Sequence, residues 1–363
     1  MCGRDYRIAV MVSRRPPIAG RFTAEELALA ARNSGMPLEA LRYEVTPPGL
    51  HYLLIHFDIP DADESGWRLE IGGLVSRPLA LSLGELKALP AKTLRVTMEC
   101  AGNGRGQLSP RYPSVPWLEE GVSTAEWTGV PLAQILELQP SATEVVFQGA
   151  DRGIDAGVEH HFARSLSRTQ ALGGEVLVAY AMNGTPLPPQ HGAPLRLIVP
   201  RWYGMASVKW LCAIEARDQP FDGLQQARGY HFRRLPGEKG EPCSLMRVNS
   251  LMAPPGIPDF YTRRRIVDAG PVEIIGRAWS GAAPVERVEF GLDGDWTPAA
   301  VAPERRAQSW TLWTFAWQAA PGNHELACRA TDAAGNTQPL EPPWDLSGFG
   351  NNGVQRIQVT VRA

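Results

Sequence analysis

The sequence has few cysteines, and they form none of the usual cysteine motifs. They are spread singly along the chain, without a C-x-x-C pair or a C-x-x-C-H haem attachment site. An odd, widely spaced set predicts no disulfide framework and no covalently attached haem. The five residues are Cys2, Cys100, Cys212, Cys243 and Cys328.

Long apolar runs and a strong net charge are also missing. No apolar stretch is long enough to cross a bilayer, and the twin arginine within residues 13–17 lacks the apolar stretch that follows it in an export signal. We therefore expect a cytoplasmic protein with no membrane partner, although a removed export signal would leave no trace. A formal net charge of −2 gives no electrostatic reason to expect nucleic acid as a partner.

Glycine and proline, by contrast, are abundant. With 36 glycines, 32 prolines and 44% hydrophobic residues, the composition favours a globular protein with many turns and short strands. A chain of 363 residues exceeds the usual size of one hydrophobic core, so we expect two domains. We place an N-terminal extension at residues 1–46, a first domain at 47–243 and a second at 244–363.

The pattern of apolar residues predicts an α+β fold. Thr23-Ala24-Glu25-Glu26 has the form of a capping box and predicts a short helix that ends at Gly35. In the first domain we expect strands at 53–57, 67–71, 94–98, 144–147 and 195–199, and helices near 83–89, 132–138 and 167–172. In the second, alternating strands at 272–275, 285–290, 309–315, 324–330 and 356–361 predict an immunoglobulin-like β-sandwich.

The most informative segment follows the predicted strand at 94–98. It reads Met98-Glu99-Cys100-Ala101-Gly102-Asn103-Gly104-Arg105-Gly106. A dinucleotide-binding loop would need the spacing G-x-G-x-x-G, which these glycines lack, and no acidic residue closes a following βαβ unit. Taken alone, Cys100 would be interpreted as a small buried apolar side chain.

Further motifs change that interpretation. Glu-Cys-Ala-Gly-Asn followed by a basic residue resembles the molybdenum-ligand loop of the sulfite oxidase family, and other segments resemble the family in the same order. They are residues 180–188, 191–196, 204–211, 278–281, 293–296, 329–336 and 338–339. The resemblance covers about residues 50–363 and implies a mixed molybdopterin-binding domain, a dimerisation domain and a homodimer.

The resemblance also implies roles for single residues. Cys100 would be the one protein ligand of a molybdenum held otherwise by a pterin dithiolene, since a thiolate is a soft, strongly donating ligand. The phosphate and pterin of that cofactor need cationic and hydrogen-bonding partners. The matching positions are His191, Arg196, Ser207 and Lys209, and more weakly Tyr52, His56, Asp151 and Val208. In the alternative interpretation, Arg196 and Lys209 are solvated charges and His191 is a turn residue.

Near the expected metal, the sequence departs from the family, which binds an anionic substrate with arginines, a tryptophan and a tyrosine. Arg105 and Trp117 match the arginine of the ligand loop and the tryptophan. Other family positions are occupied by Leu54, Ile55, Phe162 and Ser347. Because charge-assisted hydrogen bonds hold an oxyanion, their loss predicts that sulfite is a poor substrate.

Two adjacent histidines are the candidates to compensate. His160 and His161 could restore positive charge or relay protons at the catalytic site, because imidazole titrates near neutrality. An equally good interpretation is that both are exposed loop residues.

The sequence therefore predicts an oxidoreductase that uses a molybdenum–molybdopterin cofactor for two-electron oxygen-atom transfer with a small-molecule substrate. Since it has no haem motif, it needs a separate electron carrier or an external acceptor. Two alternatives stay open: an S- or N-oxide reductase on the same cofactor, and a non-catalytic dimeric binding protein.

Replacing Cys100 by serine should keep the fold and abolish activity, because a hydroxyl is a hard, weakly acidic donor where the metal requires a thiolate. The cofactor should still bind through its phosphate and pterin. Steady-state turnover of the purified variant at the wild-type rate would contradict the assignment of Cys100 as the ligand.

Overall fold

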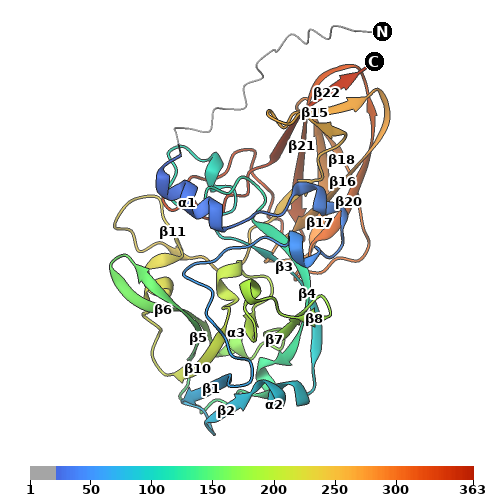
Figure 1. Cartoon of the computed structure of the whole chain (residues 1–363). Coiled ribbons are helices and arrows are strands. Elements are labelled where there is room, and N and C mark those ends of the chain that lie inside the picture. The colour runs from blue at the N-terminus through green and yellow to red at the C-terminus, as the bar shows by residue number, and fades with distance from the viewer. Residues whose placement is uncertain (1–21) are drawn as a thin grey trace, which may run out of the picture.

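The computed structural model of the chain describes residues 22–363, which form two β-rich bodies stacked end to end (Figure 1). The helix predicted from the capping box is present as α1 (Ala24–Arg32), with reciprocal bonds between Thr23 and Glu26. It ends at Asn33 rather than at Gly35. The twin arginine and Cys2 lie outside the described residues.

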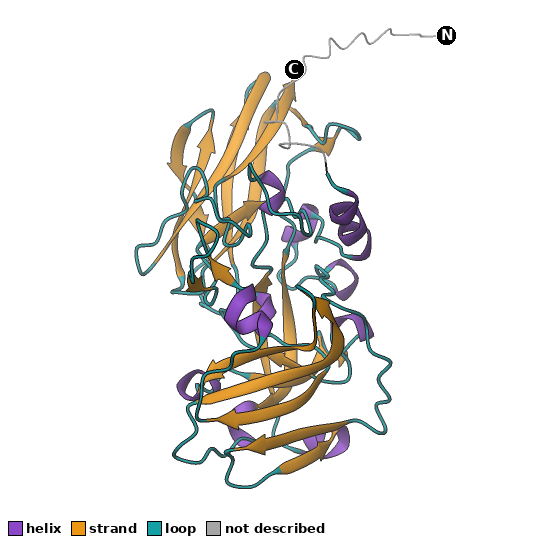
Figure 2. Ribbon diagram, turned by 90° about the vertical axis from the view of Figure 1, so that its left-hand side faces the viewer, coloured by secondary structure: helices purple, strands orange, loops and turns teal. Residues whose placement is uncertain are grey.

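Two sheets build the lower body (Figure 2). The first runs in the order β2 (Leu79–Ser82), β1 (Arg68–Gly73), β10 (Leu211–Arg217), β5 (Glu144–Asp155) and β6 (Val158–Ser167). The second runs β3 (Lys92–Glu99), β4 (Val122–Pro131), β7 (Leu177–Met182) and β8 (Thr185–Pro186), with β9 (Arg196–Ile198) also paired to β7. All neighbours are antiparallel except β1 and β10.

Helices are short throughout the described part of the chain. Besides α1 there are α2 (Leu83–Ala88) and α3 (Arg168–Ala171), both with capping boxes at a serine, as predicted near 83–89 and 167–172. The remaining helical turns are η1 (Leu38–Arg42), η2 (Pro48–Leu50), η3 (Arg105–Gln107), η4 (Leu132–Gln134), η5 (Pro189–His191), η6 (Gly204–Ala206) and η7 (Gln225–Gly229). Among residues 22–363, no helix is long and apolar enough to span a membrane.

Two expected elements are absent or shorter. Residues 53–57 form no strand: only Leu53 makes a bridge, to Ser34, and the Ile55 N–H donates to the Asn33 side chain. With no neighbouring strand to pair with, this apolar run stays irregular. The helix expected at 132–138 is only the turn η4. The structure is therefore mostly sheet, and the α+β prediction holds in its coarse form only.

Two further sheets build the upper body. One runs β13 (Asn249–Met252), β16 (Gly270–Trp279), β20 (Thr311–Ala319) and β19 (Ala300–Val301). The other runs β14 (Ile257–Pro258), β15 (Arg265–Asp268), β22 (Gln355–Arg362), β21 (Gly322–Asp332), β17 (Val285–Leu292) and β18 (Asp295–Pro298). Both contribute to one core that includes Phe290, Trp313, Trp317 and Leu326. The short pair β11 (His231–Phe232) and β12 (Glu241–Pro242) lies between the bodies in the chain.

The upper body packs against the lower through tryptophans that point away from its own core. Trp279 and Trp310 are buried in the main core of the lower body, and the Trp310 indole donates to the Glu44 carbonyl at 2.8 Å. As strand alternation predicts, Trp310 and Trp313 lie on opposite sides of β20's start. Both side chains are buried, so neither is available for a contact with another subunit.

Glu99, the last residue of β3, joins the two bodies. Its buried carboxylate accepts hydrogen bonds from Trp279 (3.0 Å) and Asn249 (3.1 Å) of the upper body and from Asn103 (3.1 Å) of the lower. Burial raises the pKa of Glu99 to about 7, against the opposing effect of these three donors. A carboxylate with only donors around it fixes the position of the loop that begins at Cys100.

Replacing Glu99 by glutamine should lower the apparent free energy of unfolding at pH 8 by about 1–3 kcal/mol, because an amide N–H₂ would face donors it cannot bond. Thermal unfolding followed by circular dichroism measures the effect. Glu126→Gln on β4 is the matched control: it removes a half-exposed pair with Arg95 and should cost less than about 1 kcal/mol. Equal losses in the two variants would contradict the anchoring role.

Candidate functional site

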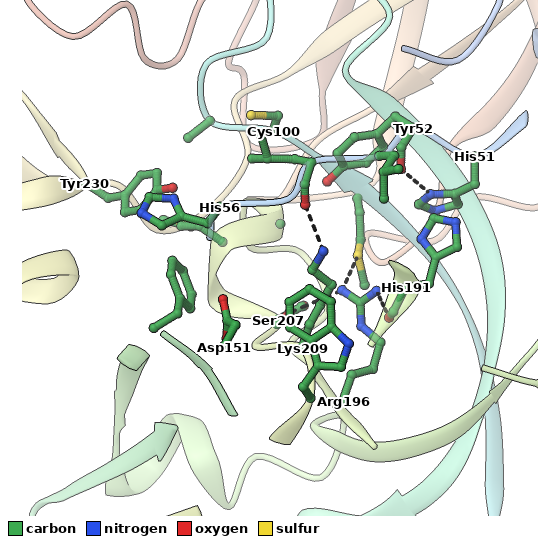
Figure 3. Close-up of a pocket in the computed structure, with 18 residues that line it drawn as sticks. His51, Tyr52, His56, Cys100, Asp151, His191, Arg196, Ser207, Lys209 and Tyr230 are labelled. Atoms are coloured by element: carbon green, nitrogen blue, oxygen red, sulfur yellow. Dashed lines mark hydrogen bonds between the residues drawn. The ribbon is translucent and has the colours of Figure 1, made fainter. Parts of the chain in front are cut away.

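A cavity with an empty volume of about 720 Å³, including its open mouth, lies in the lower body beside Cys100, the residue that follows β3 (Figure 3). Cys100, eight per cent exposed, contributes to its wall. Eight residues predicted from the sequence line this cavity: Tyr52, His56, Cys100, Asp151, His191, Arg196, Ser207 and Lys209. Folding thus brings together positions up to 157 residues apart, counted from Tyr52 to Lys209.

A backbone hydrogen bond holds Cys100 in place, and neighbouring side chains affect the pKa of its thiol. Its N–H donates to the Gly121 carbonyl at 2.8 Å. Burial raises the pKa of the thiol, while Arg105 and the Trp117 indole act in the opposite direction. A Cβ on Gly102 would lie 2.4 Å from an Arg105 nitrogen, so the loop needs glycine there to admit the guanidinium.

Arg196 and Lys209 place positive charge in the cavity. Arg196 donates to the carbonyls of His191 (2.9 Å) and Ser207 (3.2 Å), and Lys209 donates to those of Leu54 (2.8 Å) and Gln190 (3.1 Å). Within residues 22–363, neither side chain forms an ion pair with a carboxylate within 4 Å, and the Arg196 Nε atom is buried without a partner. Burial lowers the pKa of Lys209 to about 7 and that of Arg196 to about 10.

The interpretation of Arg196 and Lys209 as solvated charges is therefore wrong, whereas His191 does end a turn, η5 (Pro189–His191), in which it is buried. Arg196 is five per cent exposed and His191 four per cent. The His191 ring meets that of His51 edge to face at 5.2 Å, and burial lowers the pKa of both, that of His51 to about 4. Two neutral imidazoles offer nitrogen atoms for hydrogen bonds without adding charge.

The donor set fits a large anionic cofactor with a polar ring system. Two uncompensated cations suit a phosphate, and the His51 Nε2 and Asp151 Oδ1 atoms are buried in the wall without hydrogen-bond partners. Burial raises the pKa of Asp151 to about 6, although Lys209 opposes the rise. The described residues contain no group of three or more His, Cys, Asp or Glu side chains that could hold a metal ion. Cys100 therefore stands as one candidate ligand and not as part of a protein-only metal cluster.

Five predicted residues do not line the cavity. Arg105 lies behind Cys100, where it donates to the carbonyls of Ser347 (2.8 Å) and Val115 (3.2 Å). The Trp117 ring meets Tyr52 edge-on at 6.3 Å. Val208 is a core side chain, and its N–H and carbonyl are bonded to Ala206 and Leu197.

The two histidines lie on opposite faces of β6, because neighbouring strand residues alternate. His160 approaches the Gln225 amide (3.3 Å), which also contacts His56 (3.1 Å) and Asp155 (2.9 Å). The His161 Nδ1 atom is buried without a partner. Of the two histidines, only His160 shares its face of β6 with Phe162, which lines the cavity.

Neither His51 nor Tyr230 was predicted from the sequence as a cavity residue, although both line the cavity. Tyr230 follows η7, in a segment without any recognised motif. A charge on Cys100 raises the pKa of Tyr230 after the larger effect of burial, so the two groups are electrostatic neighbours. Tyr230 therefore adds a phenol to a cavity wall that also contains Phe162.

Comparison with known proteins identifies the two bodies. Residues 56–225 match the family described as "Oxidoreductase molybdopterin binding domain", and residues 243–362 match "Mo-co oxidoreductase dimerisation domain". Sulfite oxidase from Gallus gallus is 32% identical over 349 residues, which cover 87% of this chain and 73% of that protein. The chain belongs to the sulfite oxidase family. The predicted oxidoreductase class and molybdopterin cofactor are confirmed at the level of that family.

Two further proteins are similar to this chain over different shares of their length. Mitochondrial sulfite oxidase from Homo sapiens is also 32% identical over 339 residues, but the chain spans only 62% of its length. The sulfane dehydrogenase SoxCD from Paracoccus pantotrophus superposes with a TM-score of 0.79 over 99% of this chain and 96% of that one, at 24% identity. That likeness concerns the fold.

Replacing both Arg196 and Lys209 by alanine should lower the affinity for the cofactor by about a hundredfold or more, since each lost charge-assisted bond costs about 1.5–3 kcal/mol. The molybdenum and pterin content per protomer should fall as a result. Activity per bound molybdenum should fall much less. Metal analysis and pterin fluorescence measure occupancy. The control variant, Arg68→Ala with Lys92→Ala, removes two exposed cations of the same body and should load fully; full loading of the Arg196/Lys209 variant would refute the role.

Proposed function

We propose that this chain catalyses two-electron oxygen-atom transfer on a small substrate bound beside Cys100. The observation that carries the proposal is a buried thiol in a cavity that also holds Arg196 and Lys209, neither of which forms an ion pair within the described residues. When bound, the molybdenum cofactor supplies the two-electron redox chemistry. Cys100 would be its protein ligand, and Arg105 would lower the cost of a thiolate in a buried place.

The remaining lining residues would bind the cofactor. We assign the phosphate to Arg196 and Lys209, and hydrogen bonds of the polar ring system to His191, Ser207, Tyr52 and Asp151. His56 lies at the opposite end, against Phe162 at 5.2 Å. We therefore place His56 near the substrate rather than the phosphate.

The substrate side differs from the sequence-based expectation. Tyr230 lines the cavity, whereas Trp117 and Arg105 act on the Cys100 sulfur without lining it. The prediction that sulfite is a poor substrate rested partly on a missing tyrosine, and that ground no longer holds, because Tyr230 lines the cavity. The Tyr230 hydroxyl can donate a hydrogen bond to an oxyanion.

An S- or N-oxide reductase is the second candidate. Leu54 and Phe162 line the same cavity, and apolar walls suit a neutral substrate because they offer no partner for a desolvated anion. Either reaction needs a separate electron carrier or an external acceptor.

We further propose the division at residues 243 and 244, an immunoglobulin-like form of the upper body, and a homodimer formed through that body. The matched dimerisation domain supports the last point. Exposed apolar side chains of the upper body gather at Ile257, Phe260 and Tyr261, and a surface of this kind is typical of a contact between subunits.

We expect the holoenzyme to oxidise sulfite with ferricyanide as acceptor more efficiently than it reduces dimethyl sulfoxide with a reduced viologen as donor. The kcat/KM for sulfite should be at least about tenfold higher than that for dimethyl sulfoxide. The reason is that Arg105 and Tyr230 favour a negatively charged substrate. Neither reaction should occur in Cys100→Ser. The opposite order of rates would establish the reductase instead.

A further inference from the structure

Arg164 is a buried cation that none of the functions above uses. It lies on β6 two residues after Phe162 and four after His160, so the three side chains share one face of the strand. Phe162 lines the Cys100 cavity, and His160 contacts the Gln225 amide. The Arg164 guanidinium donates to the Gln225 carbonyl. Arg164 thus points to the cavity side of β6 and not to solvent; it is two per cent exposed.

No carboxylate neutralises this charge. Among residues 22–363, no Asp or Glu oxygen lies within 4 Å of the Arg164 nitrogens in an ion pair, and its Nε atom is buried without a partner. Burial lowers the pKa of Arg164 to about 10, and the groups that oppose this are Tyr230 and Cys243. A buried guanidinium without a counter-charge is costly, and an anion that comes near it lowers that cost.

Aromatic rings connect Arg164 with Arg105. The Arg164 guanidinium lies 5.4 Å from the centroid of the Tyr230 ring, Tyr230 stacks on Phe349 at 5.2 Å, and Phe349 lies 5.3 Å from the Arg105 guanidinium. The two aromatic rings therefore lie between the two guanidinium groups. Tyr230 is the member that reaches the cavity, on the same side as His56 (Figure 3).

We propose that Arg164 is a positioning residue for the substrate site: acting through Tyr230, it fixes the phenol and makes the site select a small oxyanion over a neutral S- or N-oxide. The proposal rests on the proposed function of the Cys100 cavity and adds to it a residue outside the cavity wall that sets its selectivity. A cation on the face of a phenol ring draws electron density from the hydroxyl, which becomes a better hydrogen-bond donor to an anion.

The experiment measures binding of sulfate, a non-reacting oxyanion, to the oxidised holoenzyme by isothermal titration calorimetry. Arg164→Met keeps the length of the side chain and removes the charge; sulfate affinity should fall about tenfold or more. Arg164→Lys keeps the charge and should stay within about threefold of the wild type. In turnover, Arg164→Met should raise KM for sulfite and leave KM for dimethyl sulfoxide unchanged.

Arg168→Met is the matched control. Arg168, four residues along, also donates to carbonyls, those of Gln139, Ala142 and Leu138, but it does not contact Tyr230 or the cavity. It should lower the melting temperature without changing sulfate affinity. Tyr230→Phe tests the route: alone it should weaken sulfate binding, and combined with Arg164→Met it should add little.

The outcomes separate this proposal from the proposed function. Purified protein that contains no molybdenum would contradict the proposed function. A molybdenum-loaded protein that does not bind sulfate, or binds it equally in Arg164→Met, overturns the role of Arg164 alone. If Arg164→Met does not fold, a large loss of affinity in folded Arg164→Lys, or no loss in Tyr230→Phe, overturns it as well.

Discussion

The constraint on which the site depends is the burial of positive charge that no ion pair of the described residues neutralises, although Asp151 acts on Lys209 from across the cavity wall. In the described part of the chain, Arg196, Lys209 and Arg164 hydrogen-bond mainly to carbonyl oxygens, and burial lowers the pKa of all three. A buried charge without a counter-charge costs several kcal/mol. The cavity therefore gains stability when negative charge enters it, as a thiolate at Cys100 and an anionic cofactor would provide. Folding fixes this electrostatic preference before any ligand binds.

The upper body contributes to the same site, although its sequence reads as a separate unit. The Ser347 carbonyl accepts a hydrogen bond from Arg105, and Phe349 lies under the guanidinium. A Cβ on Gly348 would come within 2.5 Å of Arg105, so this loop approaches as closely as a glycine permits. Together with the contacts of Glu99, these interactions make the Cys100 loop depend on both bodies. Changes in the upper body can therefore alter the environment of the thiol without touching the cavity.

The sequence predicted the strands well, because alternation of apolar residues is a local signal. It also placed Cys100 directly after a strand, as found. It failed at Leu53–Phe57, whose apolar run resembles a strand but has no partner, and at Tyr230, which becomes important only because the chain returns to the cavity. The sequence did not indicate Arg164 for a related reason, since an arginine in a strand is normally exposed. Only the tertiary fold shows that this one is buried against Tyr230.

Irregular segments, rather than strands, form much of the cavity wall, and this affects how the protein gains stability. Leu54 lies in a stretch without a strand partner, and Met205 and Tyr230 lie in or after short helical turns. Such segments have fewer backbone hydrogen bonds to neighbours and open more easily than sheet. A cofactor that bonds to Lys209 and Arg196 would connect several of them at once. Since a ligand bound only by the folded state adds to its stability, the cofactor would act as a structural element of the lower body as well as its reactive group.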